Sequence, residues 1–317
     1  MPRRTTVTVE RPKTILTRNS SPDIGFDRSI NPYRGCEHGC IYCYARPSHA
    51  YLGFSPGLDF ETRLLAKPDA AKLLRKELSA PSYKPQTMAM GTNTDPYQPI
   101  ERQYEITRQI LEVLYEYRHP VGIVTKSHLV TRDIDILSAM AKENLARVAL
   151  SVTTLDRKLA RIMEPRAATP ERRIEAIKML SDAGVPASVM FAPVIPALND
   201  MELENVLEAA AKAGARSAGY VMLKLPLEIK ELFREWLNER MPDKARHVIS
   251  LVRQMRGGKD YDPEWGKRMT GEGPIAELVA KRFRLAKARF GLNKAAPPLD
   301  LTKFRKPSAG GQLDLGL

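Results

Sequence analysis

The chain has 317 residues, of which 43% are apolar, so it is long enough to bury the core of one large domain or two small ones. It carries 50 lysines and arginines against 37 aspartates and glutamates, a net charge of +13 that favours anionic partners such as nucleic acid or smaller anionic substrates. No apolar run approaches the length of a membrane span and the first residues contain no hydrophobic signal segment, so we expect a cytoplasmic protein with no membrane partner.

The N-terminal segment, residues 1–25, is basic and shows no apolar periodicity. Its cations stand among Thr, Ser and Pro, a composition typical of segments that bury little apolar surface. We therefore predict a flexible arm, either a solvated tail or a segment that lies along a phosphate backbone. A short strand is expected near residues 28–31, and Pro32 ends it because proline lacks a backbone donor.

Every cysteine of the chain follows within eight residues: Cys36, Cys40 and Cys43, at C-x3-C-x2-C spacing. Thiolates are soft anionic ligands that suit iron–sulfur clusters, zinc or copper(I). Three of them can hold three irons of a four-iron cubane and leave the fourth iron open. The alternatives are a zinc site completed by His38 or a distant histidine, and buried cysteines that bind nothing.

The run Cys36-x3-Cys40-Ile-Tyr42-Cys43-Tyr44-Ala45 resembles the cluster loop of radical S-adenosylmethionine (SAM) enzymes, in the branch that includes spore photoproduct lyase and the DNA repair photolyase-like proteins. The resemblance implies a [4Fe-4S] cluster on the three cysteines and SAM on the open iron. It further implies an electron donor such as a flavodoxin or ferredoxin. Reductive cleavage of SAM would then give a carbon radical that abstracts a hydrogen atom from the substrate.

The same resemblance gives the two tyrosines beside the third cysteine a catalytic role. Tyr42 and Tyr44 match tyrosines implicated in hydrogen-atom return in spore photoproduct lyases, and Tyr42 is also expected to contact the cofactor. Those enzymes use a further cysteine near the end of the second strand. Residues 88–91 contain none, which puts repair of spore photoproduct itself in doubt.

Beyond the cysteine loop, strand-like and helical patterns alternate. A strand-like piece at 61–66 precedes a helix that ends near Leu78, and later helices place Ile106, Ile110 and Leu114 on one face and begin at Thr169. Alternation predicts parallel strands joined by right-handed crossovers. About six units favour an open, partial (β/α)6 barrel, the architecture of radical SAM enzymes, although a doubly wound sheet uses the same elements. The later strands are expected at 87–90, 121–125, 148–151, 185–192 and 218–223.

Polar residues at the ends of these strands are the candidate SAM contacts, because ligands bind where parallel strands end. By the resemblance, Thr92, Asn93 and Asp95 would hold the ammonium of SAM, and Lys126 and Ser151 its carboxylate or ribose. The alternatives are an ordinary Asp-Pro turn, a lysine that reaches solvent and a serine satisfied by the backbone.

The fifth strand and the helix before it complete the candidate site. The backbone at Phe191 and Ala192 would contact adenine, again by resemblance. Glu164 and Arg166 precede a helix start and receive no assigned role. They would either face the substrate or form an exposed ion pair of little energetic value.

The remaining chain divides into a helical region, residues 226–292, and a Pro- and Gly-containing tail, residues 293–317, predicted to be flexible. The barrel itself is assigned to residues 26–225. Three functions stay open: a radical SAM enzyme acting on nucleic acid, one acting on a small molecule, peptide or tRNA, and a non-catalytic nucleic-acid-binding protein stabilised by zinc or a cluster. The basic charge fits all three.

Overall fold

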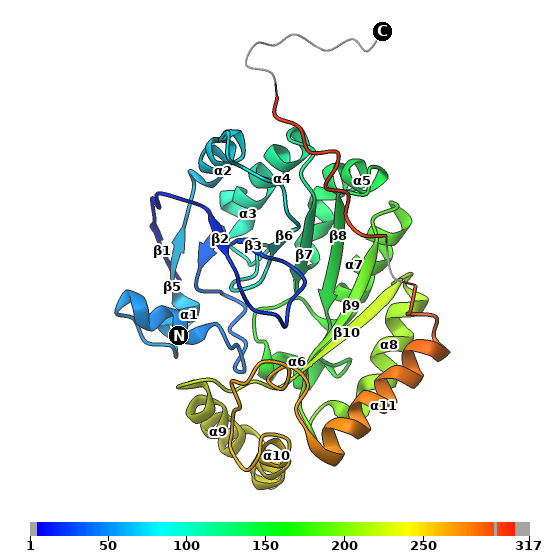
Figure 1. The fold of residues 1–317 in the computed structure, drawn as a ribbon. Helices are drawn as coiled ribbons and strands as arrows, with labels where there is room; N and C mark the ends of the chain where they lie inside the picture. Colours follow the sequence, from blue (N-terminus) through cyan, green and yellow to red (C-terminus); the bar gives the residue numbers. More distant parts are fainter. Residues whose placement is uncertain (1–4, 295–296, 308–317) are drawn as a thin grey trace.

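A computed structural model describes residues 5–294 and 297–307, and its main feature is a seven-stranded sheet in the order β10-β9-β8-β7-β6-β3-β2 (Figure 1). Six neighbouring strands of this sheet, from β3 to β10 in that order, are parallel, and β2 pairs antiparallel with β3 at one edge. The strands are β2 (Leu16–Arg18), β3 (Arg28–Ile30), β6 (Met88–Met90), β7 (Val121–Thr125), β8 (Ala146–Ser151), β9 (Ala187–Val194) and β10 (Ser217–Met222).

Helices connect the parallel strands and cover one face of the sheet (Figure 1). The strand–helix alternation and the edge that stays open between β10 and β2 confirm the predicted partial (β/α)6 barrel. The connecting helices are α2 (Ala70–Ser79), α3 (Glu101–Tyr104), α4 (Ile106–Glu116), α5 (Ile134–Lys142), α6 (Arg157–Met163), α7 (Pro170–Asp182) and α8 (Leu203–Lys212), with short 3-10 turns η2 (His128–Asp133) and η3 (Asp200–Glu202).

The core lies between the strands and these helices. Ile106, Ile110 and Leu114 of α4 are fully buried, as the helical periodicity predicts. The strand register pairs Met90 with Ile123 and Ser151 with Met190, so the carboxyl ends of neighbouring strands lie along one edge of the sheet. The loops that follow those ends therefore meet at a common mouth.

A small second sheet holds the N-terminal segment, in the order β1-β5-β4. Its strands are β1 (Thr6–Val9), β4 (Tyr33–Arg34) and β5 (Arg63–Ala66). The prediction of a free arm over residues 1–25 is wrong where β1 pairs with β5 and β2 pairs with β3. These strands are too short to show a period in the sequence, and pairing with β5, far along the chain, and with the nearby β3 stabilises them. Residues 1–4 lie outside the described residues.

The C-terminal region is helical, with α9 (Ile229–Arg240), α10 (Pro242–Gln254) and α11 (Gly273–Arg289), and α11 packs along α8 (Figure 1). In the part of the chain that the structure describes, no helix combines the length and the apolarity that a membrane crossing needs.

Part of the segment predicted as a flexible tail is docked. The amide of Arg305 donates to the carbonyl of Tyr117 at 3.0 Å, and the ring of Phe304 packs 5.5 Å from that of Tyr83 and 5.6 Å from that of His119, centroid to centroid. The prediction of a flexible tail is therefore wrong for residues 297–307, where the Phe304 ring packs against Tyr83 and His119. Residues 295–296 and 308–317 lie outside the described residues.

Candidate active site

The cysteine loop, residues 35–45, runs between β4 and the 3-10 turn η1 (Arg46–Leu52) and is held by its backbone. The amide of Cys36 donates to the carbonyl of Phe60 at 2.9 Å, just after the start of the short helix α1 (Asp59–Thr62). Gly35 has a φ of +73°, and a Cβ there would lie 2.6 Å from the Phe60 carbonyl oxygen. Only glycine fits this turn, so the loop is preshaped around the thiols.

The three thiols share this loop but differ in exposure: those of Cys36 and Cys40 are buried and that of Cys43 is half-buried. Burial raises the pKa of the Cys36 and Cys40 thiols, so metal binding there must release protons. Among the described residues, no three His, Cys, Asp or Glu side chains are close enough to share one metal ion. Each thiolate of a cubane cluster instead binds its own iron. His38, the ligand considered for zinc, faces Asp95, with Nδ1 3.4 Å from Oδ2.

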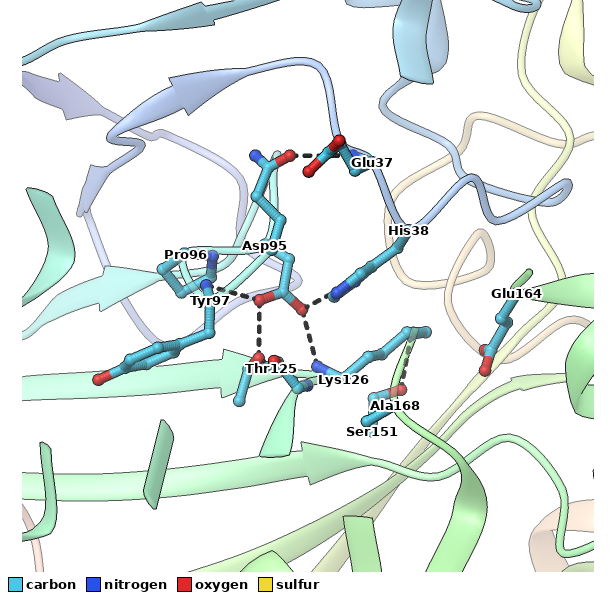
Figure 2. A network of polar contacts seen from close by, with 12 residues as sticks. Glu37, His38, Asp95, Pro96, Tyr97, Thr125, Lys126, Ser151, Glu164 and Ala168 are labelled. Atoms are coloured by element: carbon cyan, nitrogen blue, oxygen red, sulfur yellow. Dashed lines mark hydrogen bonds and ion pairs between the residues drawn. The ribbon is translucent and has the colours of Figure 1, made fainter. Parts of the chain in front are cut away.

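Asp95 joins the cysteine loop to the ends of β6 and β7 (Figure 2). Its Oδ1 accepts hydrogen bonds from the Tyr97 amide at 2.8 Å and the Thr125 hydroxyl at 2.7 Å, and its Oδ2 accepts from the Lys126 amide at 2.7 Å. With His38 on the second oxygen, the carboxylate is fully occupied by the protein. The structure thus accounts for Asp95 as a tie between three loops, and its contact with SAM stays a prediction.

Lys126 and Ser151 meet at the ends of β7 and β8, and their contacts with SAM stay predictions (Figure 2). The Lys126 ammonium donates to Ser151 Oγ at 2.8 Å, and that hydroxyl donates to the Ala192 carbonyl at 3.1 Å. Burial lowers the pKa of Lys126, and no carboxylate among the described residues lies within 4 Å of its ammonium. Three predicted contacts therefore form one chain across the mouth. Phe191, by contrast, is fully buried with its ring in the core, and the contact of its backbone and that of Ala192 with adenine stays a prediction.

The loop after β6 contributes the other predicted polar residues. The Asn31 side chain accepts hydrogen bonds from the amides of Asn93 and Thr94, at 3.2 and 3.4 Å, which fixes the turn. The carbonyl of Thr92 accepts a hydrogen bond from the Tyr44 hydroxyl. These bonds use the backbone of Thr92 and Asn93 and not their side chains, and the role of both residues toward SAM stays a prediction.

The hydroxyl of Tyr42 lies in a buried polar network. Its hydroxyl donates to Glu164, which also accepts from Thr153 at 2.5 Å and is paired with Arg173 of α7. Burial raises the pKa of Glu164, and the Arg173 charge opposes that rise. Glu164 and Arg173 are each about 2% exposed or less, so the exposed ion pair considered for Glu164 and Arg166 is not formed.

Arg166 instead clamps the cysteine loop from outside. Its guanidinium pairs with Glu61 at 2.6 Å and donates to the carbonyl of Glu37. The same carboxylate lies 3.4 Å from Arg46, whose Nε donates to the Cys40 carbonyl at 2.9 Å. The two arginines therefore hold the loop between them and bring positive charge close to the thiols.

Sequence reasoning missed one lysine at the mouth. Lys224 follows the end of β10, and its ammonium lies 4.0 Å from the centre of the Tyr44 ring. The rule that singled out Lys126, a polar residue directly after an apolar strand, applies equally to Lys224 after the run 218–223. Arg173 had no such signal, because it lies inside a helix whose other charges are solvated.

Comparison with known proteins places this site in a family. The model of the Radical SAM superfamily matches residues 30–210, which contain all three cysteines and four of the six parallel strands, β6 to β9, in full. This chain belongs to the radical SAM superfamily. It is 37% identical over 275 residues to an uncharacterized protein of Mycobacterium tuberculosis, covering 86% of this chain and 78% of the relative.

One further relative is similar in sequence, and two solved structures are similar in fold. The radical SAM Nα-GlyT isomerase of Pseudomonas phage M6 is 26% identical over 235 residues, 72% of this chain and 46% of that protein. A spore photoproduct lyase complexed with dinucleoside spore photoproduct has the same fold, with a TM-score of 0.65 at 17% identity over 90% of this chain and 79% of that one. A lyase mutant with bound AdoMet gives 0.63 at 16% identity, over 90% and 79%.

The residues at the mouth fit the cofactors of the superfamily, a [4Fe-4S] cluster and SAM. Three thiols on one preshaped loop supply the ligands of a cluster with one open iron. Lys126 supplies an ammonium without a carboxylate partner, close to the carbonyl of Ala192. A half-buried cation of this kind suits the carboxylate of an amino-acid moiety such as that of SAM.

Proposed function

We propose that this radical SAM enzyme abstracts a hydrogen atom from a nucleic-acid substrate in a lyase-like reaction. The observation that carries the proposal is the meeting, at one edge of the sheet, of the three-thiol loop, the uncompensated ammonium of Lys126 and the accessible ring of Tyr44. The cofactors belong to the family, and the substrate and the reaction type are the proposed part.

Each residue at the mouth has a distinct task in this proposal. Cys36, Cys40 and Cys43 would hold three irons, and Lys126 with Ser151 would hold the carboxylate of SAM. When bound, the cluster and SAM supply a carbon-centred radical able to abstract hydrogen. The chain orients SAM and excludes water around it, because the strand ends that carry these residues are buried.

The two tyrosines have different tasks in this proposal: one supports the cysteine loop and the other contacts the substrate. Tyr42 is 7% exposed and bonded to Glu164, whereas Tyr44 is 46% exposed at the mouth. We therefore assign the substrate side to Tyr44 and the support of the loop to Tyr42. All three cysteines of the chain lie in the cluster loop, so if they bind iron no side-chain thiol remains to return hydrogen to a product. This favours a reaction other than repair of spore photoproduct.

Three observations support nucleic acid as the substrate. The net charge of +13 suits phosphate backbones. The fold is that of a lyase solved with a dinucleoside lesion, and one relative is named as an isomerase of Nα-GlyT. If the substrate is a base in a duplex, that base must leave the stack to reach the mouth. The electron donor, of flavodoxin or ferredoxin type, and a cytoplasmic location stay predictions.

The test begins with SAM cleavage. The protein is purified without oxygen, its cluster is rebuilt with iron and sulfide and reduced, and 5′-deoxyadenosine and methionine are measured by mass spectrometry. A triple alanine variant at Cys36, Cys40 and Cys43 is the control. Cleavage by the wild type alone is the expected result. A wild type that carries zinc and makes no deoxyadenosine would support the non-catalytic alternative.

The substrate is tested in the same reaction with uniformly deuterated DNA, both irradiated and unirradiated with ultraviolet light. Abstraction from DNA transfers deuterium to 5′-deoxyadenosine, and we expect this mass shift with one of the two DNA samples. If SAM is cleaved but the 5′-deoxyadenosine never acquires deuterium from DNA, even when DNA is saturating, the proposal of a nucleic-acid substrate is refuted. It would favour a small molecule, peptide or tRNA instead.

A further inference from the structure

Two lysines at the mouth each lie over one of the tyrosines that flank Cys43. Lys126, at the end of β7, has its ammonium 5.7 Å from the centre of the Tyr42 ring. Lys224, after β10, has its ammonium 4.0 Å from the centre of the Tyr44 ring. The first pair is on the cofactor side of the proposed site. The pair of Lys224 and Tyr44 lies on the solvent-accessible side, and Lys224 is not one of the residues assigned to the cofactors.

Lys224 is a half-buried cation without a counterion. Among residues 5–294 and 297–307, no carboxylate lies within 4 Å of its ammonium, and its polar contact is the Met269 sulfur at 3.6 Å. The nearby carboxylate of Asp23 is taken by Arg268 and by the amide of Gly266 at 2.7 Å. Burial lowers the pKa of Lys224 to about 8, so the group is still mainly charged at pH 7.

A second uncompensated cation supports the same strand end. Arg256 is 2% exposed and donates to the carbonyls of Leu223 at 2.9 Å and Lys267 at 2.7 Å, while its Nε has no partner among the described groups. Carbonyl groups hold the buried Arg256 in place, whereas the half-buried charge of Lys224 is costly unless an anion approaches it. The strand end is therefore built to face an anionic group of a ligand.

The surroundings of Lys224 suit a nucleotide better than a bare anion. The turn at 264–270 is tied to β10 by a hydrogen bond from the Met222 amide to the Met269 carbonyl at 2.8 Å. The same turn carries Trp265, which is 57% exposed. The Tyr44 ring lies beside the Lys224 ammonium, and the turn that contacts this lysine through Met269 carries the second accessible ring. Such rings stack on nucleobases.

We propose that Lys224 anchors a backbone phosphate of the substrate, at a nucleotide subsite bounded by Tyr44 and the 264–270 turn. This rests on the proposed function and names the group that the site recognises. Lysine binds phosphate as a point charge, which matches a single ammonium on a strand end. Arg256 acts as a positioning residue, because it holds the carbonyl of Leu223 next to that lysine.

The test compares two ligands that differ in one charge: the dinucleotide d(TpT) and its methylphosphonate analogue, in which the linkage is neutral. Binding is measured by anaerobic calorimetry on the cluster-loaded protein with SAM present. We expect the wild type to bind the phosphodiester about ten-fold more tightly, the size of one charge-assisted hydrogen bond. Lys224→Met should bring this ratio close to one, and Lys224→Arg should keep most of it.

Lys259→Met is the matched control, since it removes an exposed lysine from the connection between α10 and α11 that carries the 264–270 turn, and it should leave the ratio unchanged. A wild type that binds both ligands equally, or neither, overturns the anchor without any variant. An unchanged ratio in a folded Lys224→Met protein overturns it as well. SAM cleavage is measured separately, so active protein without a phosphate preference refutes the anchor and leaves the radical chemistry standing.

Discussion

Replacement of Lys126 by methionine tests whether the ammonium at the end of β7 serves SAM or the fold. The side chain makes one hydrogen bond, to Ser151 Oγ at 2.8 Å, and no ion pair among the described residues. Methionine has nearly the same length and volume but carries no charge. We therefore expect Lys126→Met to fold and to keep the cluster loop, while the carboxylate of SAM loses its cationic partner.

The expected magnitudes follow from this geometry. A hydrogen bond to a charged group contributes about 1.5–3 kcal/mol, so the dissociation constant for SAM should rise roughly 10- to 150-fold. Replacing a buried cation by an apolar side chain of similar volume is close to neutral for stability. The free energy of unfolding should therefore stay within about 1 kcal/mol of the wild-type value. A large loss of SAM affinity together with a small change in the free energy of unfolding is expected only of a residue that binds the ligand.

The assay is equilibrium dialysis of SAM against the reconstituted protein, after the iron content of each variant has been matched. Lys142→Met, at the exposed end of α5, controls for the loss of one positive charge. Unchanged SAM affinity in Lys126→Met would refute the assignment of this lysine. Loss of several kcal/mol of stability, measured by urea unfolding, would show instead that the ammonium holds the strand ends together.

Three further changes probe the network, the mouth and the pH dependence. Glu164→Gln leaves Arg173 buried without its counterion and should lower the free energy of unfolding by about 3–5 kcal/mol in urea titrations; a loss under 1 kcal/mol would contradict this pairing. Tyr44→Phe should keep iron content and SAM affinity but slow substrate turnover at least ten-fold, and equal turnover would remove Tyr44 from the mechanism. Burial lowers the pKa of His119 to about 4, below its unfolded value near 6.5. The contribution of the neutral imidazole to the free energy of unfolding is therefore complete above pH 6.5 and is lost as the pH falls towards 4. We expect the unfolding free energy of the wild type to fall by about 3 kcal/mol more than that of His119→Phe across this window, and parallel curves would contradict the shift.

The barrel and the cluster loop were predictable because their signals are local. Apolar runs of four to eight residues separated by helical patterns indicate parallel strands, and C-x3-C-x2-C spacing needs no tertiary information. Lys126 and Ser151 could also be predicted as neighbours, since Lys126 directly follows β7, Ser151 is the last residue of β8, and the ends of parallel strands meet at one edge. The same rule, applied to the sixth strand, predicts Lys224.

The remaining features depend on residues far apart in the chain. Asp95 was expected to face SAM, but donors from three loops converge on its carboxylate, and no sequence pattern shows that convergence. Arg173 has the sequence neighbourhood of a solvated helix residue and is buried only because Glu164 faces it. Phe304 lies in a polar tail, and its docking depends on a gap beside Tyr83 and His119.

The two tyrosines that flank Cys43 lie in opposite environments, one buried and one exposed. Tyr42 and Tyr44 are separated by one residue, Cys43, on a tightly turned loop, and they take opposite environments. Tyr42 enters the apolar and polar interior beneath the loop, whereas Tyr44 stays accessible beside Lys224. Because Cys43 stands between them, the third thiol lies at the boundary between interior and mouth. A radical formed at this boundary would be shielded from water on the Tyr42 side and open to a substrate on the Tyr44 side. In the proposed function, the short spacing of the motif would thus separate cofactor from substrate, and Lys126 and Lys224 place one ammonium beside each tyrosine.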